Sequence, residues 1–167
     1  MAAKKKARKS ASSSKRKVTT RPQDAIALLR ADHAKVSDLF EQFEKARDDA
    51  RKQKLAQTIC MELKVHTQIE EEIFYPATRE ALPKEEDLLD EAEVEHAGAK
   101  DLIAQIEAGS PADDKWDAKV TVLSEYIKHH VKEEHTEMFP KVRNTDLDLK
   151  SLGAQLAARK EELLAGG

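Results

Sequence analysis

The sequence predicts an all-α protein, and three observations support this prediction. The 167 residues include only five glycines and five prolines, and long stretches are rich in Ala, Leu, Glu and Lys, which favour helix. Aromatic residues make up 4% of the chain, which is low for a β-sandwich. Apolar residues recur at steps of three and four along four segments, which marks one buried face of a helix. We therefore expect an up-down-up-down four-helix bundle with short connections.

The four predicted helices follow one another with short gaps. They span roughly residues 22–47, 51–80, 83–108 and 110–138. The first is opened either by Thr20 and Gln23, which have capping-box spacing, or by Asp24. The fourth is expected to begin at Ser110 and Pro111, because this pair is favoured at the N-cap and in the first turn.

The two ends of the chain differ from the bundle. Residues 1–21 carry nine Lys and Arg and no acid, whereas the remainder has a formal charge of −12. The segment lacks apolar residues to bury, so it is expected to be a disordered basic tail. At the other end, Thr145 and Asp148 form a helix-start signal ahead of several leucines, so we expect a short fifth helix despite Gly153. The predicted organisation is a tail (1–21), a bundle (22–145) and a C-terminal helix (146–167).

The composition also limits the cellular setting. Cys60 is the only cysteine, so no intrachain disulfide can form and a reducing compartment fits. No apolar run approaches the roughly 18 residues of a membrane helix, and no apolar segment follows the basic start as in a secretory signal. We expect a cytoplasmic protein without a membrane partner. The oligomeric state does not follow from the sequence.

One motif occurs twice. His66-x-x-x-Glu70 and His130-x-x-x-Glu134 lie 64 residues apart, and each histidine is followed ten residues later by a proline. Residues four apart lie on one helix face, about one turn from each other. Each His and Glu can therefore point to the same place inside the bundle.

A further histidine precedes each copy of the motif. His33 and His96 lie 63 residues apart, each in the apolar face of its predicted helix. A single core histidine is ordinarily a hydrogen-bonded core residue, but four at matched positions are hard to explain by packing alone. Burying the two carboxylates without a cation would cost several kcal/mol each, unless they took up protons. The pattern predicts two halves of one metal site.

The donor set narrows the choice of metal. Imidazole and carboxylate without thiolate suit iron, with manganese or zinc as alternatives. Six ligands exceed the roughly four that one zinc ion needs, so a dinuclear site is expected. A natural division gives each hairpin one ion, with Glu70 and Glu134 as bridges.

These motifs make the chain resemble the hemerythrin-like, cation-binding HHE family over roughly residues 24–142. The resemblance rests on Asp32-His33, Glu95-His96 and the two segments 66–76 and 130–140. It implies a four-helix bundle with a non-haem, oxo- or hydroxo-bridged centre of two Fe ions. The implied iron ligands are His33, His66, Glu70, His96, His130 and Glu134.

The chain departs from the oxygen-carrying hemerythrins at two points. They have a second histidine one turn after the ligand of the third helix, where this chain has Lys100. Their fourth helix carries His-x-x-x-x-Asp, where this chain has His-x-x-x-Glu. The missing histidine favours redox chemistry, sensing or iron handling over reversible oxygen carriage.

Two kinds of function follow as expectations. The first is an iron protein that interacts with O2, peroxide or NO, in a setting such as oxidative stress, and that is more a binding protein than a dedicated enzyme. The second is a non-enzymatic iron-binding or sensing module. The basic residues 1–21 could bind nucleic acid non-specifically by neutralising phosphates, which would place the protein at the nucleoid.

Several other residues are candidates for the surroundings of the site. His129 with Glu133 offers an alternative frame for the fourth helix, but this frame breaks the spacing to Pro140. His135 is expected to lie next to the ligands or at the surface. Tyr75 and Tyr126 could donate hydrogen bonds near the site but more often would pack at its boundary.

Overall fold

The computed structural model describes residues 23–166, and every regular element among them is helical. In chain order the elements are α1 (Ala25–Lys45), α2 (Asp49–Ile69), η1 (Glu70–Phe74), α3 (Tyr75–Ala81), α4 (Glu86–Glu107), α5 (Trp116–Glu133), η2 (Glu134–Met138), α6 (Phe139–Arg143) and α7 (Leu149–Ala165). The predicted basic tail lies outside the described residues.

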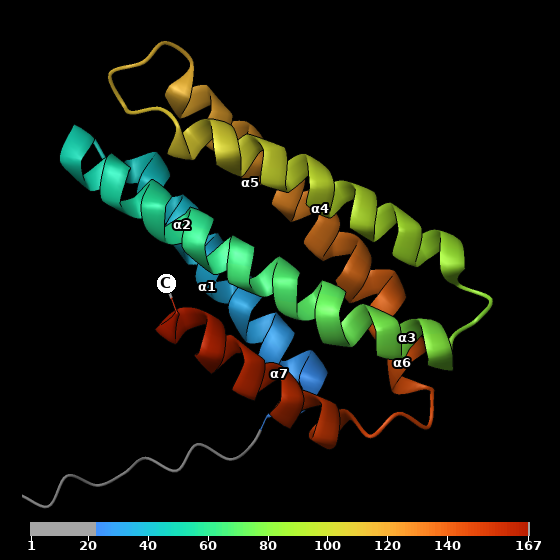
Figure 1. Cartoon of the computed structure of the whole chain (residues 1–167). Coiled ribbons are helices and arrows are strands. Elements are labelled where there is room, and N and C mark those ends of the chain that lie inside the picture. Colours follow the sequence, from blue (N-terminus) through green and yellow to red (C-terminus); the bar gives the residue numbers. More distant parts are fainter. Residues whose placement is uncertain (1–22, 167) are drawn as a thin grey trace, which may run out of the picture.

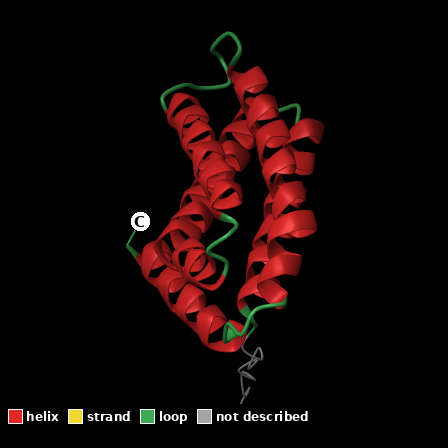
Figure 2. Cartoon of the chain, turned by 90° about the vertical axis from the view of Figure 1, so that its right-hand side faces the viewer, coloured by secondary structure: helices red, strands yellow, loops and turns green. Residues whose placement is uncertain are grey.

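The described helices form four rods with α7 beside them, and Figures 1 and 2 show this side-by-side arrangement. The second rod runs through α2, η1 and α3 without a break, and the fourth runs through α5, η2 and α6. The short turns between rods place consecutive rods side by side in opposite directions. α7 lies against α1 and α2, on the outside of the bundle. The predicted fold class is confirmed.

Aspartate side chains cap three helix starts. Asp24 accepts a hydrogen bond from the Ala27 amide at 2.7 Å, and Asp48 accepts one from the Arg51 amide at 2.9 Å. Asp148 does the same at the start of α7. Each satisfies an amide that has no partner within its own helix. Of the two predicted starts of the first helix, Asp24 is the N-cap.

The predicted start of the fourth helix is wrong by five residues. The N-cap of α5 is Lys115 and not Ser110, because the intervening residues form a turn. The Asp113 carboxylate accepts a hydrogen bond from the Ser110 amide at 2.7 Å. Lys115 then has a φ of 67°, which is the left-handed region and interrupts a right-handed helix. The third helix likewise begins at Glu86, not near Pro83.

Two apolar clusters fill the bundle, one on each side of its middle. One surrounds Phe40, Phe43 and Trp116, and the other surrounds Phe74 and Phe139 and includes the leucines of α7. The polar residues of the duplicated motif lie between them. Among residues 23–166, no helix is both long and apolar enough to cross a membrane.

Candidate metal centre

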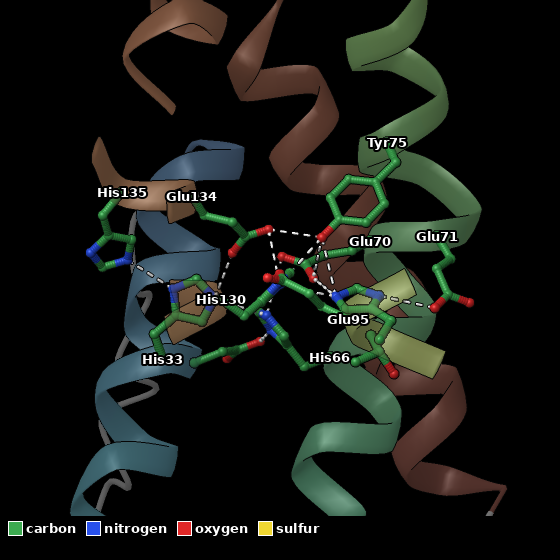
Figure 3. A network of polar contacts seen from close by, with 12 residues as sticks. His33, His66, Glu70, Glu71, Tyr75, Glu95, His130, Glu134 and His135 are labelled. Atoms are coloured by element: carbon green, nitrogen blue, oxygen red, sulfur yellow. Dashed lines mark hydrogen bonds and ion pairs between the residues drawn. The ribbon is translucent and has the colours of Figure 1, made fainter. Parts of the chain in front are cut away.

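The six residues of the duplicated pattern come together inside the bundle, and Figure 3 shows five of them: His33, His66, Glu70, His130 and Glu134. All six are buried, with exposed fractions between 0% and 7%. His33 Nε2 lies 2.9 Å from His66 Nε2, and His96 Nε2 lies 3.1 Å from His130 Nε2. The two histidines of each hairpin therefore face each other, as the predicted division into two halves requires.

The two glutamates connect the histidine pairs. Glu70 Oε1 lies 3.1 Å from His66 Nε2, and Glu70 Oε2 lies 3.1 Å from His96 Nε2. Glu134 Oε2 lies 3.2 Å from His33 Nε2, and Glu134 Oε1 lies 3.4 Å from His130 Nε2. Each carboxylate thus presents one oxygen to each pair, which is the arrangement that a bridging carboxylate needs.

Each histidine turns its Nε2 toward the cluster and its Nδ1, the outer nitrogen, away from it. In two of the histidines the outer nitrogen contacts the carboxylate of the residue that precedes a ligand position. His66 Nδ1 lies 3.3 Å from Asp32 Oδ2, and His130 Nδ1 lies 2.6 Å from Glu95 Oε2. Asp32 comes directly before His33, and Glu95 comes directly before His96. A carboxylate on the outer nitrogen fixes the ring orientation and makes the inner nitrogen a better metal ligand.

The other two outer nitrogens are held by the residue that follows each glutamate. His96 Nδ1 lies 2.9 Å from Glu71 Oε1, and His33 Nδ1 lies 2.8 Å from His135 Nε2. Lys100 donates to both oxygens of Glu71, at 2.7 and 2.6 Å. Lys100, which stands where oxygen-carrying hemerythrins have a ligand, therefore anchors the partner of a histidine in this chain.

Each glutamate also begins a π-helical turn. The Tyr75 amide donates to the carbonyl of Glu70, and the Phe139 amide donates to the carbonyl of Glu134, five residues back in both cases. Pro76 and Pro140 follow directly, and proline has no amide to continue the regular helical ladder. Such wide turns are rare in proteins, and those that occur are often found at functional sites.

The π-turn brings Tyr75 into the site, so of the two roles that the sequence offered for Tyr75, hydrogen bonding and packing at the boundary, the structure shows the first. In a regular helix a residue five positions on points about 140° away, but the wider turn returns Tyr75 to the side of Glu70. The Tyr75 hydroxyl donates to Glu134 Oε1 at 2.9 Å and lies 3.1 Å from His96 Nε2. Tyr75 is fully buried. The proline six residues after each glutamate was the signal that could have revealed this geometry.

Opposite charges stabilise each other inside the cluster. Burial and Glu134 raise the pKa of Glu70, but His66 and His96 outweigh them and lower it to about 2. Burial lowers the pKa of His66, but Glu70 and Asp32 outweigh it and raise it to about 10. Near neutral pH, the metal-free site therefore holds protons on imidazoles beside ionised carboxylates.

The residues fit a metal centre. Glu70 Oε1 and Glu134 Oε2 accept no hydrogen bond from the residues that the structure describes, although each lies within 3.2 Å of an imidazole nitrogen. These atoms are close without being aligned as donor and acceptor, as expected of ligands that point at a common third atom. A cation there would satisfy buried carboxylate oxygens that otherwise carry a desolvation cost.

A small cavity lies beside the cluster. It is bounded by all four histidines and by apolar residues that include Val36, Leu63 and Ile127. Its volume is about 10 Å³, which is roughly the room that one water-sized molecule needs. Ile127 and Val131 also line a cleft of about 180 Å³ between α1 and α5. His33 lines both as well, so the cavity and the cleft are neighbours.

The remaining candidates lie away from the cluster centre. The side chain of His129 is 64% exposed and contacts Glu133 at 3.1 Å, so the frame of His130 and Glu134 is the buried one. Tyr126 is 44% exposed. Cys60 is buried among apolar residues, and burial raises the pKa of its thiol to about 12.

A buried cluster of histidines and glutamates in a helical bundle defines a metal-binding class of protein. The chain belongs to the hemerythrin HHE cation-binding domain family, whose profile matches residues 24–142. It is 30% identical over 119 residues to a protein from Nostoc sp. described as a DNA nickase, covering 70% of this chain and 33% of that protein. This chain thus spans about a third of that relative's length.

A solved structure shares the fold. It is a hemerythrin HHE cation-binding domain-containing protein from Mycobacterium kansasii, with a TM-score of 0.74 and 24% sequence identity. The likeness covers 86% of this chain and 89% of that chain. It extends beyond the 119 residues of the family match, and it shows the fold alone.

Proposed function

We propose that the protein is a non-haem diiron protein that binds a small oxidant: O2, peroxide or NO. The observation that supports this most is the position of Glu70 and Glu134, each of which presents one oxygen to each histidine pair. His33 and His66 would hold one ion, and His96 and His130 the other. Iron is the metal that this donor set favours, ahead of manganese or zinc. Bound iron would supply the redox chemistry.

The chain's own residues would orient and enclose the reactants. The partners on the outer nitrogens hold the four rings in place. The Tyr75 hydroxyl offers a hydrogen bond at the centre of the cluster. The cavity beside the histidines is lined by Val36, Leu63 and Ile127 as well as by the imidazoles. Its volume of about 10 Å³ suits only a very small molecule at that place.

The test is to load the purified protein anaerobically with ferrous iron, count the metal, add oxygen and record the visible spectrum. We expect two irons per chain and a ligand-to-metal absorption band after oxygen is added. A band that disappears when oxygen is removed would mean reversible binding. Irreversible oxidation, or turnover with peroxide, would favour redox chemistry. One ion or none per chain would overturn the dinuclear proposal.

The second candidate is an iron-binding or sensing module without turnover. It predicts two irons per chain, uptake of iron coupled to greater stability, and no spectral response to oxygen. The same loading experiment separates it from the first candidate.

Association with DNA is a separate proposal. It is supported by the nine basic residues in positions 1–21 and by the similarity to a protein described as a DNA nickase. A gel-shift assay across a salt series, with and without residues 1–21, tests it. We expect salt-sensitive binding only in the longer form, and equal binding by both forms would exclude this role for the segment. A location in the cytoplasm stays a prediction.

A further inference from the structure

α7 packs against α1 and α2 from outside the four-rod bundle (Figure 1). Its Lys160 Nζ donates to Asp32 Oδ1. The other oxygen of Asp32 faces the outer nitrogen of His66 at 3.3 Å. Three side chains on α7, α1 and α2 thus form a chain of contacts that ends at a candidate metal ligand.

This ion pair differs from an ordinary surface pair. The side chain of Asp32 is 9% exposed and that of Lys160 is 21% exposed. Exposed pairs contribute little because water and salt screen them. A pair at this depth is screened less, and removing one partner leaves a poorly solvated charge. Lys160 is therefore well placed to hold the Asp32 carboxylate in one orientation.

α7 is fixed in position along the bundle, so Lys160 is presented by a rigid element. A Cβ atom on Gly153 would lie 2.3 Å from the carbonyl oxygen of Gln23, so only glycine permits this close approach to the chain just before α1. Arg159 binds Glu72 through two nitrogens, at 2.6 and 3.1 Å. Leu156 is fully buried against the bundle.

The second half of the site has no equivalent contact among the described residues. Glu95 occupies the position that matches Asp32, 63 residues later, and it holds His130. Its other oxygen faces His129 at 3.4 Å, and the side chain of His129 is 64% exposed. The carboxylate behind one histidine pair is thus anchored by a half-buried lysine, and the carboxylate behind the other is left near solvent.

We propose that Lys160 is a positioning residue for the ion held by His33 and His66, acting through Asp32 on the orientation of His66. α7 is then part of the metal centre and distinguishes one ion from the other. This inference rests on the proposed function, namely that the chain binds two ions.

The test is an anaerobic titration of the full chain with ferrous iron, in competition with a chelator, for wild type and for Lys160→Met. Loss of an orienting contact of this kind typically costs about 10–100-fold in metal affinity. We expect that loss for one of the two ions and no change for the other. Removing a positive charge would by itself favour a bound cation, so weaker binding indicates lost orientation. Lys160→Arg should restore most of the affinity.

Two variants on α7 serve as matched controls. Lys150→Met makes the same substitution at an exposed position and should leave both affinities unchanged. Arg159→Ala weakens the attachment of α7 without touching Asp32, so any effect of docking alone appears there. In an Asp32→Asn background, Lys160→Met should cause no further loss of affinity. Lys160 acts on His66 only through the Asp32 carboxylate, which this background has already removed.

The outcomes separate the two proposals. If wild type binds one ion or none, the proposed dinuclear function fails. If wild type binds two ions and Lys160→Met binds both equally well or more tightly, only the positioning role of Lys160 is overturned. That role is also overturned if both ions weaken equally, or if Arg159→Ala reproduces the loss. If Lys160→Met fails to fold, Lys160→Gln, which also removes the charge but keeps a polar side chain, takes its place in the same titration with the same expected and overturning results.

Discussion

The first hairpin of the bundle, α1 to α3, and the second, α4 to α6, place matched residues at matched positions but surround them differently. Asp32 and Glu95 precede the first histidine of each half, and both hold the second histidine of their own half. Glu71 and His135 follow the two glutamates, and each holds a histidine of the opposite half. The duplication therefore covers the partners of the ligands as well as the ligands.

The two halves differ where these partners change chemistry. Glu71 is a carboxylate, whereas its counterpart His135 is an imidazole. Tyr75 stacks on His96, with ring centroids 5.2 Å apart, and its counterpart Phe139 stacks on His33 at 6.1 Å, but only Tyr75 brings a hydroxyl to the centre. The two halves thus have the same ligands at the same positions but different residues around them. We expect two bound ions to be inequivalent in affinity and reactivity.

The largest expected effect comes from removing one ligand in each half. His66→Ala and His130→Ala should lower the iron content from two per chain to one or none, because each removes a histidine and leaves a buried carboxylate with one partner fewer. Metal analysis after anaerobic loading measures this. His129→Ala, at an exposed position in the second half, is the control and should keep both ions. Full iron content in either ligand variant would contradict the site assignment.

pH tests whether protons and metal compete for the same nitrogens. Glu70 raises the pKa of His66 to about 10, and Glu134 raises that of His130 to about 11, both against the effect of burial. A metal ligand must be unprotonated, so apparent affinity should rise by up to about tenfold per pH unit for each proton displaced between pH 7 and 9.

Stability of the metal-free protein should show the opposite trend. A raised histidine pKa stabilises the fold below the unfolded value of 6.5, and this contribution is lost as pH rises through about 10 to 11. Without metal, the thermal unfolding temperature should therefore fall as pH rises from 6.5 to about 10 to 11. With metal bound, it should fall much less. Parallel curves for the two forms would contradict a competition between protons and metal.

Glu71 and His135 are the partners of the outer nitrogens of His96 and His33. Replacing each of them by glutamine tests whether they differ in importance. Glu71→Gln removes a charged acceptor from His96 and should weaken iron binding by about 10–100-fold. His135→Gln removes an imidazole partner and should cost less, because no carboxylate is lost. A competition titration of both variants gives the comparison. Equal losses would mean that the two halves do not differ in this respect.

The contact of α7 with the first hairpin can be broken at a single position. Gly153→Ala should destabilise the fold by about 1–3 kcal/mol, because the added methyl group meets backbone that cannot move aside. Chemical denaturation measures this. Gly166→Ala at the end of the same helix, where the nearest atom is 3.4 Å away, is the control. A neutral Gly153→Ala would show that α7 packs less closely than the structure indicates.

The smallest effect is expected from making the first half resemble the second. Tyr75→Phe removes one buried hydrogen bond of about 0.5–1.5 kcal/mol, so iron content should remain two per chain. The rate of iron oxidation by oxygen, followed by rapid mixing, should change by roughly two- to tenfold. Tyr126→Phe at an exposed position should change nothing. An unaltered rate in Tyr75→Phe would remove the hydroxyl from the chemistry.

Much of this arrangement could be predicted from the chain alone. Helical periodicity predicts the rods because apolar residues spaced by three and four must share a face. The same periodicity places His66 with Glu70, and His130 with Glu134, because residues four apart lie one turn from each other. The repeat then pairs the halves, so the six clustered side chains follow from local spacing combined with duplication.

Tertiary structure decided what local spacing cannot describe. Tyr75 enters the site only because a π-turn inserts one extra residue after Glu70, which changes the face on which every later residue lies. Asp113 and Lys115 delay the start of α5, because a side-chain hydrogen bond and a left-handed residue outweigh the helix-start signal at Ser110. Lys160 meets Asp32 across 128 positions of sequence, and no periodicity connects residues so far apart. The candidate ligands were thus determined locally, whereas the surroundings that distinguish them depend on how the rods and α7 pack.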